Sequence, residues 1–380
     1  MKNRFLISVA VAALVGISSQ ADAFETKARY AILSDADTFE YLFVKDANRP
    51  VPTASMSKLM TVYLLLDELK KGNISLDTPF SVSENAWRKG GAATGGSTMF
   101  LKIGDKVKVE DLLRGIIVQS GNDACIVAAE NLVGSEEDFV ELMNKRAPEL
   151  GLKNSHFANS TGLPHPDHKM SMEDLAILAK RIMTDFPEFY HIFSQKEFTY
   201  NGIKQWNRNP LLYNMKGADG LKTGHTEEAG FGVVASVKKG KRRLIAVVSG
   251  LNSNKERSEE VKNMMEYGFR EFDNYKIWAA HDVLDEADVW YGKEDKVPLV
   301  LEKDLLKTME RAKAGTYKMK IEYDKPVRAP IKKGRKIGEV VFEYDGNITT
   351  YPLVAQKDVE ETGVIGKFIA NVKYLLSGRK

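Results

Sequence analysis

Apolar residues recur every three or four positions through much of the middle of the chain. Between about residues 55 and 71 they form one continuous apolar face, the pattern of an amphipathic helix buried along one side. The same spacing predicts a closing helix at 258–272. Further helices are predicted at 109–120, 123–133, 136–150 and 171–184.

Short apolar runs on both sides of this helical region predict strands. Residues 31–43 read as two strands joined by a turn at 35–37. Residues 231–237 and 243–251 read as two adjacent strands joined by the basic turn 238–242. A helical insert between strands that come together from both ends predicts an α+β fold, in which helices cover an antiparallel sheet.

Beyond about residue 277 the apolar spacing changes to two. Apolar and charged residues alternate between 317 and 323, which is typical of a half-buried strand. Asp345-Gly346-Asn347 lies between two further apolar runs and is a hairpin signal. The chain is therefore predicted to hold a first domain at 24–277 and a small all-β domain at 278–357.

The first 23 residues have the plan of a secretory signal peptide. Lys2 and Arg4 precede an apolar stretch at 5–17, and Ala21-Asp22-Ala23 is a small-x-small cleavage site. The apolar stretch is too short to span a membrane. We expect an exported protein whose mature chain begins at Phe24; the alternative is a buried N-terminal helix.

The last residues, 358–380, are predicted to form a basic amphipathic helix. No acidic residue follows Gly363, and Lys367, Lys373 and Arg379 supply positive charge. Such a helix suits the surface of an anionic membrane; the alternative is a helix docked on the β domain. The apolar residues that share an arc of about 140° are Val364, Ile365, Phe368, Ile369, Val372, Leu375 and Leu376.

Composition narrows the classes of function. The 380 residues include 55 Lys and Arg against 52 Asp and Glu, so the net charge of +3 argues against a nucleic-acid-binding protein. A hydrophobic share of 43% excludes global disorder. With one cysteine, Cys125, the chain has no intramolecular disulfide and no multi-cysteine metal site.

Ser55 and Lys58, at the start of the predicted helix 55–71, are the first candidates for chemistry. Their spacing places a hydroxyl and an amine one turn apart on the same face. A serine nucleophile needs a base, and a lysine can serve where burial and nearby cations lower its pKa. The same spacing recurs at Ser236 and Lys239, but in a predicted strand, where these side chains point to opposite faces.

Ser120-Gly121-Asn122 separates two predicted helices. Two hydrogen-bonding side chains on either side of a glycine can both turn toward one cleft. The alternative is a plain turn between helices, in which Asn122 or Asp123 is the N-cap.

Lys222-Thr223-Gly224-His225 directly precedes the predicted strand 231–237. A lysine and a hydroxyl beside a glycine, which allows close approach of the backbone, can hold a carboxylate and an acyl group. The alternative is an exposed edge strand protected by its lysine.

Three other features have simpler interpretations. His165-Pro166-Asp167-His168 resembles a metal cluster but reads better as a polar loop. Glu141 and Asn144 imitate a water-activating pair but lie within a predicted amphipathic helix. Cys125 is expected to be a small buried residue rather than a reactive thiol.

The three polar sets occur in a characteristic order. Ser-x-x-Lys, Ser-x-Asn and Lys-Thr-Gly, 65 and then 102 residues apart, resemble the motifs of penicillin-binding proteins and serine β-lactamases. From about Ala31 to the C-terminus the chain resembles the low-molecular-mass penicillin-binding proteins that are D-alanyl-D-alanine carboxypeptidases. The stretches that carry this resemblance are ASMSKLMT, GGSTMFLKIGD, QSGNDACIVAAE, NSTGLP and GLKTGHT.

The resemblance implies a role for each catalytic candidate. Ser55 is the acylated nucleophile, and Lys58 accepts its proton. Ser120 relays the proton to the leaving D-alanine, and Asn122 holds the substrate and Lys58.

The resemblance also implies a set of substrate-binding residues. Lys222 and Thr223 bind the terminal carboxylate, with a contribution from Arg257. Gly224 allows the strand to approach, and the backbone N–H groups of Ser55 and His225 form the oxyanion hole. No metal or cofactor is expected.

The activity implied is that of a periplasmic serine carboxypeptidase attached to the inner membrane. Its substrate is the peptidoglycan stem pentapeptide, and β-lactam antibiotics inhibit it. A serine β-lactamase, a peptidoglycan DD-endopeptidase and a non-catalytic wall-binding protein remain alternatives.

Overall fold

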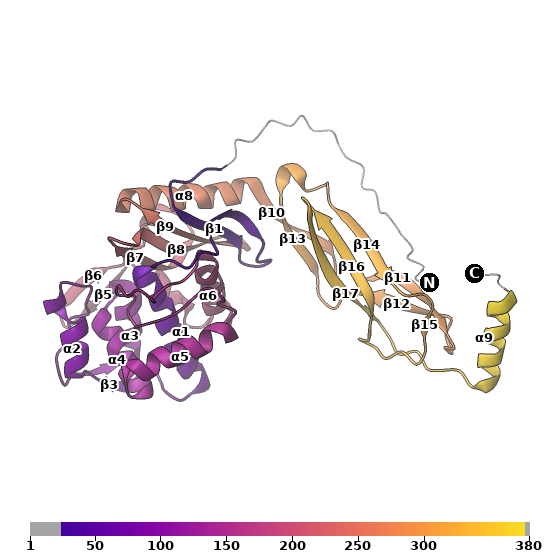
Figure 1. Cartoon of the computed structure of the whole chain (residues 1–380), viewed down its shortest axis with the longest axis horizontal. Helices are drawn as coiled ribbons and strands as arrows, with labels where there is room; N and C mark the ends of the chain where they lie inside the picture. The colour runs from indigo at the N-terminus through magenta and orange to yellow at the C-terminus, as the bar shows by residue number, and fades with distance from the viewer. Residues whose placement is uncertain (1–23, 377–380) are drawn as a thin grey trace. The chain divides into compact units, whose positions relative to one another are not determined.

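The computed structural model describes residues 24–376, and side chains through residue 372. The predicted signal peptide lies outside the described residues, as does the end of the tail. The chain divides into two compact units, with the division between Arg270 and Glu271 (Figure 1). Each unit is described by itself.

A five-stranded antiparallel sheet organises the first unit. Its strand order, β2-β1-β9-β8-β7, places the first two strands of the unit beside its last three. The predicted α+β fold is confirmed, because a helical insert separates strands that pair in space. The strands are β1 (Tyr30–Asp35), β2 (Tyr41–Lys45), β7 (Ala218–Thr226), β8 (Gly230–Lys239) and β9 (Arg242–Leu251).

Helices lie on both sides of this sheet. In Figure 1, α8 (Asn254–Glu271) lies on one side and the helical insert on the other. Gly268 lets α8 approach closely, since a Cβ there would lie 2.7 Å from Leu33 and 2.8 Å from Leu244. The helices of the insert are α1 (Lys58–Lys71), α2 (Glu84–Gly90), α3 (Val109–Arg114), α4 (Asn122–Val133), α5 (Glu136–Glu149) and α6 (Met172–Asp185).

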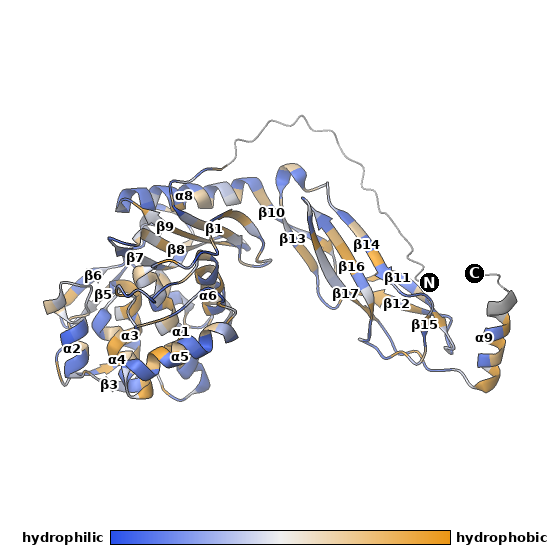
Figure 2. Cartoon of the chain, in the orientation of Figure 1, coloured by the Kyte–Doolittle hydropathy of each residue, from blue (hydrophilic) through white to orange (hydrophobic). Residues whose placement is uncertain are grey.

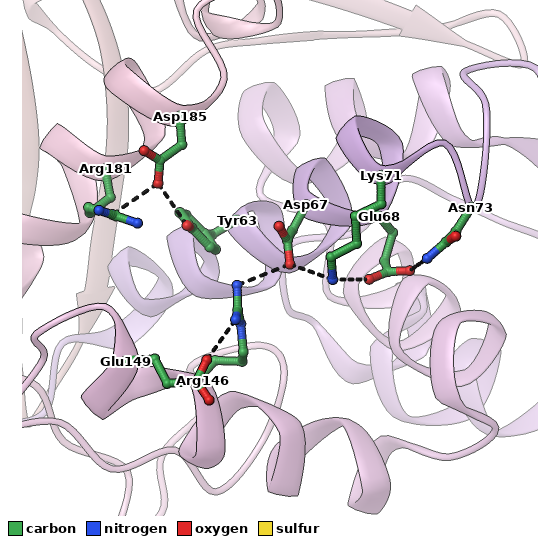
Figure 3. Close-up of polar contacts among 9 residues, drawn as sticks. All are labelled: Tyr63, Asp67, Glu68, Lys71, Asn73, Arg146, Glu149, Arg181 and Asp185. Carbon is green, nitrogen blue, oxygen red and sulfur yellow. Dashed lines mark hydrogen bonds and ion pairs between the residues drawn. The ribbon is translucent and has the colours of Figure 1, made fainter.

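Polar contacts hold α1 against two neighbouring helices (Figure 3). The Tyr63 hydroxyl donates to Asp185 Oδ2 of α6 at 2.8 Å. Arg146 of α5 pairs with Asp67 at 3.1 Å. Because the pairs are only partly exposed, they help to fix the helix that begins with Lys58.

The structure differs from the predicted elements in two places near the insert. The predicted helix 109–120 divides into α3 and a π-helical turn, Gly115–Gln119. The helix α2 was not predicted, because the glycines at 90, 91, 95 and 96 indicate an irregular loop in this part of the chain. Gly90 instead lets α2 pack against α4, since a Cβ there would lie 2.3 Å from Asp123 N.

Five short elements of the first unit had no predicted counterpart. The strands β3 (Pro79–Ser81) and β4 (Lys106–Lys108) form one antiparallel pair. A second pair, β5 (Glu197–Tyr200) and β6 (Ile203–Trp206), is followed by α7 (Leu211–Asn214). The Asn201-Gly202 dipeptide between β5 and β6 is a strong hairpin signal that could have predicted this pair.

The second unit is built on strands, as predicted. One sheet has the order β14-β16-β17-β12-β11-β15, and β10 pairs with β13. The predicted hairpin joins β16 to β17, with positive φ at Asp345 and Gly346. The strands are β10 (Phe272–Trp278), β11 (Val283–Trp290), β12 (Lys296–Val300), β13 (Leu305–Glu310), β14 (Lys318–Tyr323), β15 (Val327–Arg328), β16 (Lys336–Tyr344) and β17 (Asn347–Ala355).

The helix α9 (Val364–Leu376) follows the strands of this unit and is rich in hydrophobic residues (Figure 2). Among the described helices, none is both long enough and apolar enough to cross a membrane. Tyr291 contacts the polar side of α9, donating to Asn371 Oδ1 at 2.7 Å. The apolar side chains that α9 leaves exposed are Val364, Ile365, Phe368, Ile369 and Val372.

Candidate active site

Ser55 and Lys58 lie at the entry to α1. Ser55 is part of a 3-10 turn, Ala54–Ser57, that leads directly into the helix. Lys58 is fully buried, and its Nζ lies 3.0 Å from Ser55 Oγ. The predicted pairing of hydroxyl and amine is therefore present in the structure.

Two further acceptors surround the Lys58 amine. Its Nζ donates to Asn122 Oδ1 at 2.7 Å and to the backbone carbonyl of Thr161. The Thr161 carbonyl was not predicted, because a main-chain oxygen has no signature in a sequence. Together with Ser55 Oγ, these oxygens account for all three hydrogens of a lysine ammonium.

Ser120 and Asn122 lie where the π-helical turn ends and α4 begins. Ser120 is buried, and its φ of 62° turns the chain sharply at this point. The N-cap of α4 is Gly121, without a side-chain cap bond. The simpler interpretation, in which Asn122 or Asp123 is the N-cap, is wrong; the Asn122 side chain faces Lys58 instead.

Asp123 holds the segment that passes beside Asn122. Its buried carboxylate accepts from Met99 N at 2.8 Å, Leu101 N at 3.1 Å and Thr98 Oγ1 at 2.6 Å. The neighbouring Asn122 N–H donates to Ser97 O at 2.8 Å. A buried carboxylate is stable where several donors satisfy it, so this network gives a reason for the acid after Asn122.

The strand β7 brings Lys222, Thr223 and Gly224 beside the turn that carries Ser55. A Cβ on Gly224 would lie 2.7 Å from Thr53 O and 3.1 Å from Met56 N, so a side chain there would collide with that turn. Although β7 is at the edge of the sheet, Lys222 is 3% exposed and Thr223 is 5% exposed. The alternative of a surface lysine that protects a sheet edge is therefore wrong.

His225 and Arg257 meet around one aromatic ring. The exposed His225 ring stacks on Phe231 with centroids 3.8 Å apart. The Arg257 guanidinium, from α8, lies 5.7 Å from the centre of the same ring. Arg257 is 5% exposed and donates to Asn254 Oδ1 at 2.6 Å.

Arg208 is a further cation near the site that sequence reasoning missed. Its Nη1 donates to Ser97 Oγ at 2.6 Å, and its carbonyl accepts from Arg257 Nη2 at 3.4 Å. It lies in a short polar stretch after β6 that resembles none of the motifs. No local sequence signal therefore distinguished it from other surface arginines.

Burial and mutual repulsion depress the pKa values of these cations. Burial, with a contribution from the Arg208 charge, lowers the pKa of Lys58 to about 8. Burial, with the charges of Lys58 and Arg208, lowers the pKa of Lys222 well below its usual value. Burial and Arg208 lower the pKa of Arg257 to about 10. A bound carboxylate would relieve this repulsion, so the site favours an anionic ligand.

The remaining candidates lie outside this cluster. Asn144 holds a loop, pairing with the backbone N and O of Phe157 at 2.9 and 2.8 Å, while Glu141 is exposed. Cys125 is fully buried, and burial raises the pKa of its thiol to about 12, as expected for an unreactive cysteine.

The stretch 165–168 was expected to be a polar loop. Residues 165–167 are exposed, as expected, but His168 is buried. His168 is 3% exposed, its Nδ1 accepts from Ala158 N at 3.2 Å, and burial lowers its pKa to about 4. His168 is thus a buried neutral residue because the chain folds back over it. Within residues 24–372 no group of three or more His, Cys, Asp or Glu side chains is placed to hold a metal ion.

Comparison with known proteins relates this geometry to a family. Residues 17–253 match the model of D-alanyl-D-alanine carboxypeptidases, peptidase family S11. Residues 272–361 match the model of the C-terminal domain of penicillin-binding protein 5.

Individual proteins agree with these matches. The chain is 38% identical over 340 residues to D-alanyl-D-alanine carboxypeptidase DacD of Escherichia coli K12, with 88% of each chain covered. The crystal structure of penicillin-binding protein 5 from Haemophilus influenzae is 37% identical, with a TM-score of 0.83 over 90% of this chain and 100% of that one. Penicillin-binding protein D2 of Listeria monocytogenes in its ampicillin-bound form is 27% identical, with a TM-score of 0.57 over 66% of this chain and 100% of that one. The chain therefore belongs to the D-alanyl-D-alanine carboxypeptidase family, peptidase family S11.

Proposed function

We propose that the chain removes the terminal D-alanine of peptidoglycan stem peptides through an acyl-enzyme on Ser55. The contact between Lys58 Nζ and Ser55 Oγ carries this proposal, because it joins a hydroxyl to a base of lowered pKa. At pH 7 a pKa of about 8 leaves roughly one amine in ten neutral, against roughly one in three thousand at the ordinary value of 10.5. Family membership independently supports a serine hydrolase.

The reaction proceeds in two balanced steps. Ser55 Oγ bonds to the carbonyl carbon of the penultimate D-alanine as its proton passes to neutral Lys58. The peptide C–N bond then breaks, and the leaving amine takes a proton from Lys58 through Ser120. Water hydrolyses the resulting ester and restores the Ser55 hydroxyl.

Binding of the terminal carboxylate is assigned to β7 and its neighbours. Lys222 and Thr223 lie beside the Ser55 turn, and Arg257 and Arg208 add positive charge on the same side of the cluster. Backbone N–H groups of Ser55 and His225 would stabilise the charge that develops on the carbonyl oxygen. A need to bind the terminal carboxylate of the substrate explains why the site holds several cations that repel one another.

The β-lactamase alternative is weaker because a β-lactamase needs an acid that activates water for deacylation. The candidate pair is not formed, since Glu141 is exposed and the Asn144 amide accepts from Phe157 N through its oxygen and donates to Phe157 O through its nitrogen. A DD-endopeptidase would use the same residues on a cross-linked substrate. All three motifs are intact, which argues against a purely wall-binding role.

The lifetime of the penicillin adduct tests this function. Mature protein mixed with benzylpenicillin is expected to gain the mass of one ring-opened penicillin and to keep it for minutes or longer. Intact-protein mass spectrometry over time, beside an assay of D-alanine release from a pentapeptide, gives the measurement. Loss of the adduct within seconds with turnover of the drug would instead support a β-lactamase.

We further propose that the mature protein lies in the periplasm, attached to the inner membrane through α9. The support is the predicted signal peptide together with five exposed apolar side chains on a helix that has no acidic residue after Gly363. Burying such side chains in a membrane surface stabilises the membrane-bound state by about 25 cal/mol per Å² of apolar area removed from water. Anionic lipids would attract the lysines and arginine of this segment.

Deletion of residues 363–380 is expected to release the protein into the soluble fraction and to leave D-alanine release unchanged. The deletion begins at 363 because Val359 is buried and exchanges backbone hydrogen bonds with Ile331. Flotation with anionic vesicles measures binding, and a full-length variant with I365E and F368E serves as a length-matched control. Continued flotation of both variants would contradict the proposed attachment.

A further inference from the structure

The segment 158–163 forms the wall of the site that faces Lys58. The Thr161 carbonyl in this segment accepts from Lys58 Nζ. Gly162, with a φ of 76°, lies against the Ser55 turn, since a Cβ there would be 2.2 Å from Ala54 O. The position of the segment therefore determines where one of the Lys58 acceptors lies.

Two consecutive carbonyls of this segment bind two residues on one face of α1. Thr61 Oγ1 donates to Ser160 O at 2.7 Å, and Lys58, three residues earlier, donates to Thr161 O. The Asn159 side chain braces the same turn, because its Oδ1 accepts from Gly162 N at 2.7 Å. The segment is thus held from the α1 side and from within.

Glu136 holds the segment from the other side. It lies in the first turn of α5, and its Oε1 accepts from Ser160 N at 3.0 Å and from Ser160 Oγ at 2.6 Å. Ser160 is 1% exposed, so a buried N–H and hydroxyl depend on this carboxylate. None of the three motifs includes Glu136, and the reaction proposed above does not use it.

The contact between Glu136 and Ser160 affects the chemistry through the orientation of the Lys58 amine. As a base, Lys58 is a neutral amine with two hydrogens and one lone pair. Asn122 Oδ1 and Thr161 O can only accept, so each takes one hydrogen. The lone pair is then left directed toward the Ser55 hydroxyl, whose proton it must take.

We propose that Glu136 is a positioning residue: by holding Ser160, its carboxylate places the Thr161 carbonyl that orients the Lys58 lone pair toward Ser55. This inference rests on the proposed function of Ser55 and Lys58. It assigns to Glu136 a hydrogen-bonding role, which a neutral amide of the same shape can also fill. Loss of the Glu136 acceptor would release Ser160 and shift the Thr161 carbonyl. The Lys58 side chain would stay in place, but its amine would be free to rotate.

The test is the rate of acylation by benzylpenicillin in the full chain with Glu136→Gln and Glu136→Ala. The glutamine variant is expected to acylate within about threefold of the wild-type rate, because its Oε1 can still accept from Ser160. The alanine variant is expected to acylate on the order of 10- to 100-fold more slowly, as for a small misplacement of a reacting group. Glu137→Ala, which removes the exposed carboxylate next along α5, is the matched control and should behave as wild type.

Two measurements distinguish a misplaced Lys58 amine from a smaller amount of folded protein in the Glu136→Ala variant. In Glu136→Ala every molecule should still become acylated, so the final adduct stays at one per chain while the rate falls. The deficit should also persist at high pH, where Lys58 is neutral in all variants. A reduced final adduct at an unchanged rate, or a wild-type rate in Glu136→Ala, would overturn the proposal.

Two further outcomes complete the test. Glutamine and alanine variants that are equally slow would show that the charge of Glu136 acts, contrary to the proposal. If Glu136→Ala does not fold, Thr61→Val removes the hydroxyl that holds Ser160 O and should also slow acylation at full amplitude; a wild-type rate there would count against the proposal. Failure of the wild-type protein to form any adduct would contradict the function of Ser55 itself.

Discussion

Replacing Ser55 by alanine is expected to abolish formation of the penicillin adduct and to lower D-alanine release by on the order of 10⁴-fold or more. Without the hydroxyl there is no atom that can form the acyl-enzyme, whatever the state of Lys58. Ser55 lies in a 3-10 turn and is only partly buried, so alanine should leave the fold intact. The mass of the protein after mixing with benzylpenicillin measures the effect directly.

Ser236→Ala is the matched control for this experiment. Ser236 repeats the Ser-x-x-Lys spacing with Lys239, but it is buried within β8 and accepts from Arg243 Nη1, while Lys239 is exposed. The strand places the two side chains on opposite faces, so this copy is not a catalytic pair. Full adduct on Ser55→Ala would mean that another residue is the nucleophile.

Replacing Lys58 by methionine is expected to slow acylation of Ser55 by about 10² to 10⁴-fold, the usual contribution of a general base. Methionine approximates the length of the buried lysine stem without an amine. The remaining rate should come from substrate binding and the oxyanion hole. Adduct formation over time, compared with wild type at one pH, gives this ratio.

The pH dependence of wild-type acylation provides a second measure of Lys58. Only the neutral amine can accept the Ser55 proton, and burial lowers the pKa of Lys58 to about 8. The rate should therefore rise about tenfold per pH unit below that value and level off above it. Burial also lowers the pKa of Lys222 well below its usual value, and loss of its charge would act in the opposite direction by weakening carboxylate binding. A rate that does not change between about pH 6 and pH 8 would exclude Lys58 as the base.

Much of the fold followed from apolar spacing along the chain. The helices α4, α5 and α6 begin and end within two residues of the predicted bounds, because each buries one continuous face in the core. The pairing of β1 with β9 was anticipated from the order of strands around the insert. By contrast, α2 was not predicted, because apolar spacing does not reveal that Gly90 lies against Asp123 of α4.

The sequence by itself determined which residues meet in the candidate active site. The pairing of Ser55 with Lys58 is a local consequence of a turn that enters a helix, so a three-residue spacing sufficed to predict it. The order of the three motifs identified their partners in Asn122 and in β7. These features depend on the type of side chain and on the spacing of residues within a turn or helix, and both can be read from the sequence.

Only the tertiary structure decided the burial, the charges and the hydrogen-bond partners that surround those residues. The lowered pKa of Lys58 arises from burial and from Arg208, which is 150 positions away in the chain and has no recognisable motif. The Thr161 carbonyl that binds Lys58 is a backbone atom, and Glu136 acts on it through Ser160 from another helix. Burial and long-range backbone contacts are properties of the packed chain, so no pattern of residue types could reveal them.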